Sequence, residues 1–214
     1  MPFAIEPGRT VLFIGDSITD CGRRAEHRPL GAGYVRMAVD LINARYPDNG
    51  CTFVNTGIGG NIVRDLFDRW TDDCIAYAPD WLSVMVGIND LNRWLSGRED
   101  IYGPDGYADY YGKILTRARE ETDAELILMT PFYMSKASPG EESWRGRVMA
   151  ALPAYIEVVE QMAERPDARL VRCHRMFQEQ LEYHHPCEFG DEPVHPNATG
   201  HLLLAYAWLQ SVGW

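Results

Sequence analysis

The chain has 214 residues, of which 46% are hydrophobic and 24% are charged, and its formal net charge at pH 7 is −11. This size and composition are typical of one globular domain, and we expect a single domain over residues 1–214. The strong negative charge argues against nucleic acid or an anionic membrane as partner, because phosphate groups would be repelled.

The ends of the chain and its cysteines carry no export or membrane signal. The first eight residues lack a basic start and a long apolar core, so we expect no signal peptide. The apolar run at 202–209 is too short to span a membrane. The cysteines are odd in number, lack CxxC spacing and stand at positions 21, 51, 74, 173 and 187. This pattern suggests neither a zinc site nor a redox pair, and it fits reduced thiols in a cytoplasm.

Strands and helices alternate along the sequence. Apolar runs predict buried strands at residues 10–14, 51–55, 80–86, 125–129 and 168–172. Helical spacing of apolar residues predicts helices at 33–46, 62–70, 107–118, 148–162, 176–183 and from 197 onward, with Asn197 as N-cap. Polar stretches predict loops at 21–29, 91–106, 131–146 and 184–196. Pro153 predicts a kink or a later start of its helix. The alternation predicts an α/β fold with a five-stranded parallel sheet and helices on both faces.

Ser17 stands at the carboxyl end of the first predicted strand, which Gly15 ends. Ligands of open α/β sheets bind at that edge. A serine there is a candidate nucleophile, provided that a base and oxyanion donors lie nearby. The alternative is a serine that caps the following helix. Cys21, four residues later, is expected to be a small buried thiol.

Two turns that follow predicted strands could supply the oxyanion donors. The backbone N–H of Gly60, in a glycine-rich turn after the second strand, could approach a ligand closely. The side-chain amide of Asn89, just past the third strand, could donate without adding charge. The alternatives are an ordinary tight turn and an Asx-turn.

His195 lies in a proline-rich loop together with Asp191 and Glu192. A histidine with an adjacent carboxylate is a base with its orienting group built in. Histidines also occur nearby at positions 184, 185 and 201, but their spacing fits no metal-site motif. We therefore expect neither a metal nor a cofactor.

Ser17, Gly60, Asn89 and His195 stand in the order and spacing of the four blocks that name the SGNH (GDSL-type) hydrolase family, which the chain resembles over its whole length. The resemblance implies a flavodoxin-like three-layer α/β/α sandwich and ester hydrolysis through a serine. It implies that Ser17 is the nucleophile and His195 the base. It also implies an oxyanion hole formed by the N–H groups of Ser17 and Gly60 and the side chain of Asn89. Thr19 departs from the Gly-x-Ser-x-Gly elbow of α/β-hydrolases, which argues against that fold.

Within this family, segments 15–23, 87–90 and 129–133 are similar to the bacterial acetylxylan esterases. Those enzymes are intracellular, remove acetyl groups from xylo-oligosaccharides and form oligomers. We therefore expect a cytoplasmic esterase that binds a small-molecule ester and assembles into a homo-oligomer. One alternative is a lysophospholipase or thioesterase with the same machinery, although the polar loop at 135–147 suggests no greasy acyl channel. Another is an inactive module that binds carbohydrate.

The acid that would orient His195 is left open by the sequence. The family usually has Asp three residues before the histidine, and here that position holds Glu192. Asp191 has the usual residue type but stands one position too early. Because one step along an extended segment turns a side chain to the opposite side, the spacing favours Glu192. A local bulge would favour Asp191.

Overall fold

A five-stranded sheet lies at the centre of the protein, which is seen here as a computed structural model describing residues 3–98 and 102–214. All strand pairs are parallel, and the order across the sheet is β2-β1-β3-β4-β5. The strands are β1 (Thr10–Gly15), β2 (Thr52–Asn55), β3 (Trp81–Met85), β4 (Glu125–Met129) and β5 (Ala168–Val171). This topology confirms the predicted α/β fold class.

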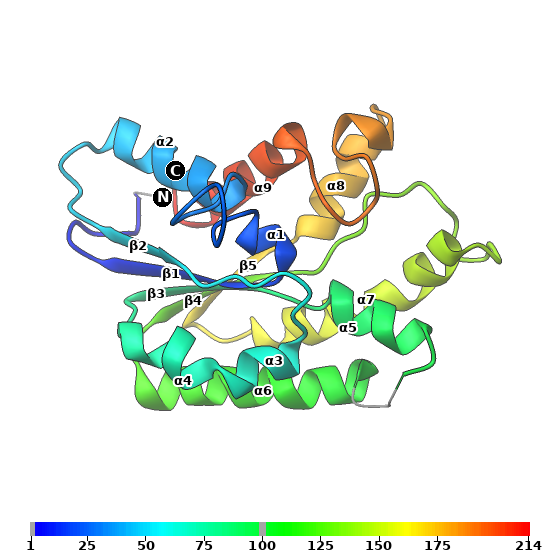
Figure 1. Ribbon diagram of the computed structural model, residues 1–214, viewed down its shortest axis with the longest axis horizontal. Helices are drawn as coiled ribbons and strands as arrows, with labels where there is room; N and C mark the ends of the chain where they lie inside the picture. The colour runs from blue at the N-terminus through cyan, green and yellow to red at the C-terminus, as the bar shows by residue number, and fades with distance from the viewer. Residues whose placement is uncertain (1–2, 99–101) are drawn as a thin grey trace.

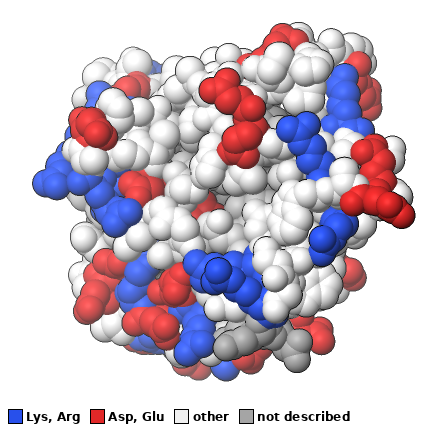
Figure 2. Space-filling model, turned by 45° about the vertical axis from the view of Figure 1, so that its right-hand side comes forward, with Lys and Arg blue, Asp and Glu red and all other residues white. Residues whose placement is uncertain are grey.

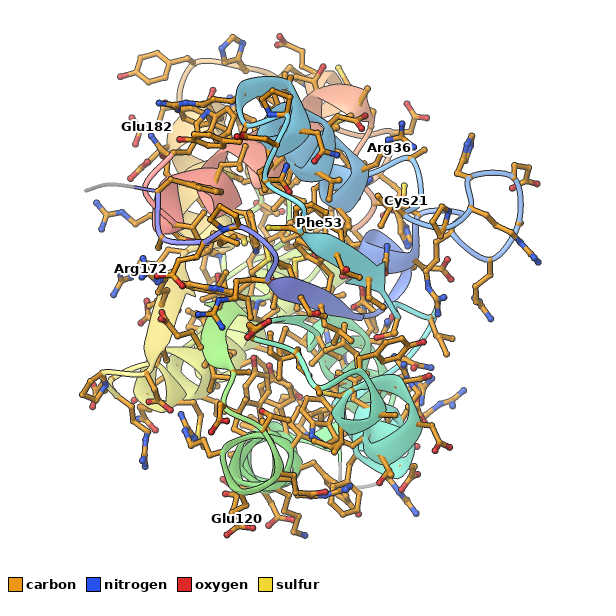
Figure 3. The ribbon with its side chains drawn as sticks, turned by 90° about the vertical axis from the view of Figure 1, so that its left-hand side faces the viewer. Cys21, Arg36, Phe53, Glu120, Arg172 and Glu182 are labelled. Atoms are coloured by element: carbon orange, nitrogen blue, oxygen red, sulfur yellow. The ribbon has the colours of Figure 1, made fainter. Side chains whose placement is uncertain are left out.

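Two layers of helices cover the faces of the sheet (Figure 1). One layer contains α1 (Ser17–Asp20), α2 (Tyr34–Arg45), α8 (Cys173–Leu181) and α9 (Ala198–Ser211). The other contains α3 (Val63–Asp68), α4 (Trp70–Asp73), α5 (Ile88–Leu95), α6 (Pro104–Glu121) and α7 (Trp144–Met162). In Figure 3 the exposed residues Arg36 on α2 and Glu120 on α6 mark the outer sides of the two layers, with the sheet between them.

Burial on both faces explains why the central strands read as continuous apolar runs. Residues 11–14 of β1 and 126–129 of β4 have no exposed surface. Edge strand β2 instead begins with an exposed residue, and Phe53 within it is half-buried (Figure 3). Fully burying a large apolar side chain contributes roughly 1.5–3 kcal/mol, so the three central strands carry much of the stability of the sheet.

The tyrosine-rich face of α6 fixes the end of β3. Tyr107 is completely buried, its ring centroid lies 5.1 Å from that of Tyr155 on α7, and its hydroxyl donates to the carbonyl of Val86 at 3.0 Å. The next residue, Gly87, has φ of +134°, and a Cβ there would lie 2.9 Å from the Tyr107 hydroxyl. Only glycine fits this turn, which leads directly into the segment that carries Asn89.

Two predicted loops are partly helical. Residues 88–95 form α5, where a loop over 91–106 was expected; residues 99–101 of that loop lie outside the described part of the chain. The prediction was wrong because eight residues that begin with a polar turn leave too little periodicity to read. Helix α7 begins at Trp144, earlier than expected, because the Ser143 side chain caps it by accepting from the Gly146 N–H. Pro153 lies inside this helix without ending it.

The direction in which strands are added across the parallel sheet reverses after β2. From β1 the chain moves to β2 on one side of the sheet, and β3 is then added on the other side of β1. The carboxyl ends of β1 and β3 therefore border the crevice in which ligands of such folds bind. Among the described residues, no helix is both long enough and apolar enough to cross a membrane.

Candidate active site

Ser17 is the first residue of α1 and follows β1 after a single intervening residue, Asp16. Asp16 is the N-cap of the helix, and its carboxylate accepts the N–H of Ile18 at 3.0 Å. The alternative interpretation of Ser17 as the helix cap is therefore wrong. The turn requires glycine at position 15, because a Cβ there would lie 2.3 Å from the Met85 carbonyl oxygen. Close contact with β3 thus places Ser17 at the crevice.

A continuous chain of hydrogen bonds joins Ser17, His195 and Glu192. Ser17 Oγ lies 2.8 Å from Nε2 of His195, and His195 Nδ1 lies 2.5 Å from Oε1 of Glu192. The serine and the histidine are 178 positions apart in the sequence. This order of hydroxyl, imidazole and carboxylate is the arrangement that lets a serine attack an acyl carbon.

Glu192 is fixed by the backbone of its own loop. Its carboxylate accepts the N–H of Val194 at 2.8 Å and the N–H of His195 at 2.6 Å. The loop is anchored in turn where the Pro193 carbonyl accepts the N–H of Met134 at 2.9 Å. Three donors on one carboxylate hold it in one orientation.

Asp191 does not take part in this network. Its side chain is exposed and, within residues 3–98 and 102–214, forms no hydrogen bond. It instead lines a pocket of about 430 Å³ next to the triad-like residues, together with Lys136, Glu141 and Arg145. Of the two carboxylates that the sequence left open, the structure brings Glu192 to His195.

The glycine-rich turn after β2 lies directly against α1. The N–H of Ile58 donates to the Gly15 carbonyl at 3.1 Å, and the N–H of Gly59 donates to the buried Asp20 carboxylate at 3.0 Å. A Cβ on Gly59 would lie 3.8 Å from Cβ of Ser17. Gly60 has φ of +80°, the left-handed region that favours glycine. Among the described residues the Gly60 N–H has no acceptor, so it is a donor beside Ser17 that a ligand can use.

Asn89 is the second residue of α5 and faces the same turn. Its Nδ2 donates to the Asn61 carbonyl at 3.0 Å. A side-chain amide carries two N–H donors, so one remains for a ligand after this bond is made. The Asn89 amide thus faces the turn that contains Gly60, and this turn lies against α1, where Ser17 is hydrogen-bonded to His195.

Two buried carboxyl groups support this arrangement and were not identified from the sequence. Asp90 accepts the N–H of Val63 at 3.1 Å and so ties α5 to α3. Burial, reinforced by the charge of Asp16, raises the pKa of Asp90 to about 7. Burial likewise raises the pKa of Asp16 to about 6. Both residues adjoin a predicted site residue in the sequence, which is the signal that could have identified them.

His184, His201 and Cys21 lie outside the hydrogen-bonded path of Ser17, His195 and Glu192. His201 is buried, its Nδ1 accepts the N–H of Tyr34 at 3.2 Å, and its Nε2 lies 3.5 Å from Sγ of Cys21. His184 instead pairs with Glu188 at 3.1 Å. Cys21 begins the loop that follows α1 (Figure 3), and burial raises the pKa of its thiol. In the described part of the chain, no three His, Cys, Asp or Glu side chains group as metal ligands would.

Figure 2 brings forward the side of the molecule at which the strands end, and it shows acidic and basic side chains around a largely uncharged middle. The pocket next to Glu192 is lined by charged side chains of both signs, Lys136, Arg145, Glu141 and Asp191, together with smaller apolar ones such as Ala137 and Pro186. Such a lining suits a ligand rich in hydroxyl groups better than a long acyl chain.

The chain is similar to known proteins over nearly its whole length. The model of the GDSL-like Lipase/Acylhydrolase family matches residues 13–203. The chain is 39% identical to an acetylxylan esterase of Geobacillus stearothermophilus over 217 residues, covering 98% of this chain and 96% of that protein.

Solved structures show the same likeness. The crystal structure of Axe2, an acetylxylan esterase from Geobacillus stearothermophilus, matches with a TM-score of 0.87 and 36% identity, covering 99% of this chain and 97% of that one. LAE5, an alpha/beta hydrolase enzyme from the metagenome of Lake Arreo, Spain, matches with a TM-score of 0.87 and 30% identity, covering 99% and 98%.

Further matched structures are catalytic mutants of Axe2 in which a serine, an aspartate or a histidine is replaced by alanine. In Axe2 that aspartate stands three residues before the histidine, the spacing that separates Glu192 from His195 here. The chain belongs to the GDSL-like lipase/acylhydrolase family and is a carboxylic-ester hydrolase.

Proposed function

We propose that this protein removes acetyl groups from xylo-oligosaccharides or related carbohydrates, with Ser17 as nucleophile, His195 as general base and Glu192 as the acid that orients the histidine. The observation that carries the assignment of roles is the unbroken path from Ser17 Oγ to Nε2 of His195, at 2.8 Å, and from its Nδ1 to Glu192, at 2.5 Å. The likeness to acetylxylan esterases supports the substrate.

The first half of the reaction is acylation. As Ser17 Oγ attacks the carbonyl carbon of the ester, Nε2 of His195 takes the hydroxyl proton. The negative charge that develops on the carbonyl oxygen is stabilised by the N–H groups of Ser17 and Gly60 and by the Asn89 amide. When this intermediate collapses, the bond to the sugar oxygen breaks and His195 returns the proton to that oxygen. The sugar leaves, and the acetyl group remains attached to Oγ of Ser17.

The second half is hydrolysis of the acyl-serine. Water takes the place of the sugar and His195 accepts one of its protons, so that hydroxide attacks the acyl carbon. Acetic acid leaves and the proton returns to Ser17 Oγ. Through both halves Glu192 keeps the imidazole in one tautomer and stabilises its charged form. No metal or cofactor takes part in this scheme.

The surroundings of Glu192 favour a carbohydrate over a long acyl chain. A lysophospholipase or thioesterase needs an apolar channel, whereas the lining of the pocket beside Glu192 includes four charged side chains, those of Lys136, Glu141, Arg145 and Asp191. A module that only binds carbohydrate would have no need of a serine hydrogen-bonded to a histidine and a carboxylate.

Release of acetate from acetylated xylo-oligosaccharides tests the substrate. We expect turnover on these sugars, and on p-nitrophenyl esters a preference that falls steeply from acetate to octanoate. A preference for octanoate or for lysophospholipid would show that the substrate is wrong while leaving the assigned roles intact. Ser17→Ala is the inactive control.

Two further inferences belong to this proposal. We infer a cytoplasmic location from the odd number of scattered cysteines, which fits a reducing compartment; cell fractionation with antibody detection tests it. We also infer a homo-oligomer, supported by the resemblance to oligomeric esterases. Sedimentation velocity would overturn it by showing only a monomer at micromolar concentration.

A further inference from the structure

Arg69 lies between α3 and α4 and is largely buried, with 15% of its side chain exposed. Its guanidinium contacts several segments of the site. Nε donates to Oδ1 of Asn61 at 2.9 Å, and Nη1 donates to the Thr56 carbonyl at 2.8 Å. Nη2 donates to the Gly15 carbonyl at 3.3 Å. We propose that Arg69 is a positioning residue for the oxyanion hole, acting on the catalytic groups through Asn61.

The three acceptors belong to parts of the chain that must stay in register for the hole to exist. Gly15 ends the strand before Ser17, Thr56 follows β2, and Asn61 closes the turn that contains Gly60. A guanidinium has five N–H donors in a rigid planar fork, so one side chain can hold all three carbonyl groups at once.

The path from Arg69 to Asn89 is short. Arg69 holds the side chain of Asn61, and the carbonyl of Asn61 accepts Nδ2 of Asn89 at 3.0 Å. The N–H of Asn61 also donates to the Ile58 carbonyl at 3.2 Å, which closes the turn around Gly60. Loss of Arg69 would free Asn61 to move, and both the Gly60 N–H and the Asn89 amide would lose their fixed directions. Preorganised donors are what an oxyanion hole requires.

A purely structural role is the competing explanation. Arg69 also forms an ion pair with Asp73 of α4, with Nη1 at 2.6 Å from Oδ2. That pair would stabilise the helix junction whatever the state of the active site. The two explanations can be distinguished by substituting Asp73, because Asp73 contacts Arg69 but none of the three carbonyl groups that Arg69 holds.

The test is a double-mutant cycle between Arg69→Gln and Asn89→Ala, with kcat and KM measured on p-nitrophenyl acetate. We expect Arg69→Gln to lower kcat by about 10- to 100-fold, since small displacements of catalytic groups have effects of this order, while KM changes less than about twofold. In the Asn89→Ala background the same substitution should lower kcat by less than about threefold, because residues that act through one another are not additive.

Matched variants isolate the positioning role. Arg119, on α6, is similarly buried, with 20% of its side chain exposed, and it pairs with Asp167 at 2.6 Å. Arg119→Gln should lower the melting temperature and leave kcat unchanged. Asp73→Asn, which removes only the ion pair, should do the same. Arg69→Lys can keep an ion pair with Asp73 but not the forked contacts, so it should regain stability without regaining kcat.

The result that overturns the inference is an additive cycle, or a kcat loss in Asp73→Asn as large as that in Arg69→Gln. If Arg69→Gln does not fold, Asn61→Ala replaces it in the cycle, because Asn61→Ala removes the side-chain acceptor of Arg69 and keeps the backbone carbonyl that Asn89 contacts.

The inference rests on the proposed role of Asn89. If Asn89→Ala alone leaves kcat unchanged, that role and the inference fail together. If Asn89→Ala lowers kcat and Arg69→Gln does not, only the inference fails.

Discussion

Glu192 accepts hydrogen bonds from both the ring and the backbone of His195. Its Oε1 lies 2.5 Å from Nδ1 of His195 and 2.6 Å from the main-chain nitrogen of the same residue. The side chain therefore folds back over Pro193 and closes a small ring with its own loop. In this conformation a glutamate three residues before the histidine reaches the imidazole ring, at the spacing that separates the aspartate and the histidine replaced in the catalytic mutants of Axe2.

The first prediction separates the two acidic residues. Glu192→Gln should lower kcat by up to about 10⁴-fold, because an amide facing Nδ1 favours the wrong imidazole tautomer. Asp191→Asn should change kcat less than about threefold, since its carboxylate is exposed and outside the network. Steady-state kinetics on an acetyl ester compare the two. A large loss confined to Asp191→Asn would reverse the assignment.

The second prediction concerns the nucleophile. Ser17→Ala should lower kcat by about 10⁴-fold or more, as in other triad knockouts, with a melting temperature close to that of the parent protein. Ser96→Ala is the matched control, because Ser96 Oγ donates to a helix carbonyl, Asn92 O, at 2.7 Å. More than a few per cent of residual activity in Ser17→Ala would exclude the proposed mechanism.

The third prediction concerns the Asn89 amide. Asn89→Ala should lower kcat by about 10²- to 10³-fold with little change in KM, because the donor acts on the developing oxyanion more than on the bound ester. Asn92, on the same helix, has a buried Oδ1 without a partner among the described residues. Asn92→Ala should therefore be close to neutral. An effect of Asn89→Ala on KM alone would make Asn89 a substrate-binding residue.

The fourth prediction uses two glycines with the same backbone conformation. Gly60 has φ of +80° and Gly8 has φ of +81°, and an added Cβ would meet no atom within 4 Å at either. Substitution by alanine should therefore destabilise both variants equally, by about 1–2 kcal/mol of backbone strain. Only Gly60→Ala should lower kcat, because the backbone N–H of residue 60 is the proposed oxyanion donor and that of residue 8 is not. Equal kcat values in the two variants would remove Gly60 from the hole.

The fifth prediction concerns acid stability. Burial, reinforced by the charge of His195, lowers the pKa of His201 to about 4. An unfolded histidine titrates near ~6.5, so between these pH values the unfolded chain binds the extra proton. The stability that neutral His201 contributes is therefore complete above about pH 6.5 and is lost as the pH falls toward 4, on the order of 3 kcal/mol in total.

Urea unfolding between pH 7 and pH 4 measures this dependence. His201→Asn, whose carbonyl oxygen can accept the Tyr34 N–H in place of Nδ1, should unfold more easily at pH 7 but show a shallower decline toward pH 4. The exposed His27 provides the control, since His27→Asn should keep the slope of the parent protein. An unchanged slope in His201→Asn would show that His201 is not the group whose protonation is linked to unfolding.

The sequence by itself determined the sheet and the edge at which the site forms. Parallel strands that are buried on both faces consist of continuous runs of apolar residues, and their carboxyl ends lie at the same edge of the sheet. Ser17, Gly60 and Asn89 each follow such a run, so their convergence could be predicted. Helix α5 could not be predicted from the sequence, because its eight residues are too few to show a periodic pattern.

Only the tertiary structure decided which carboxylate reaches His195 and which distant segments Arg69 contacts around the proposed oxyanion donors. The choice between Asp191 and Glu192 depends on whether the loop bends back on itself, and contacts such as that between Pro193 and Met134 fix that bend. From the sequence, Arg69 is predicted only to be a positively charged residue in the helix expected at 62–70. Its contacts with Gly15, Thr56 and Asn61 come from segments up to 54 residues away, and local propensity holds no information on which distant carbonyl groups a side chain will meet.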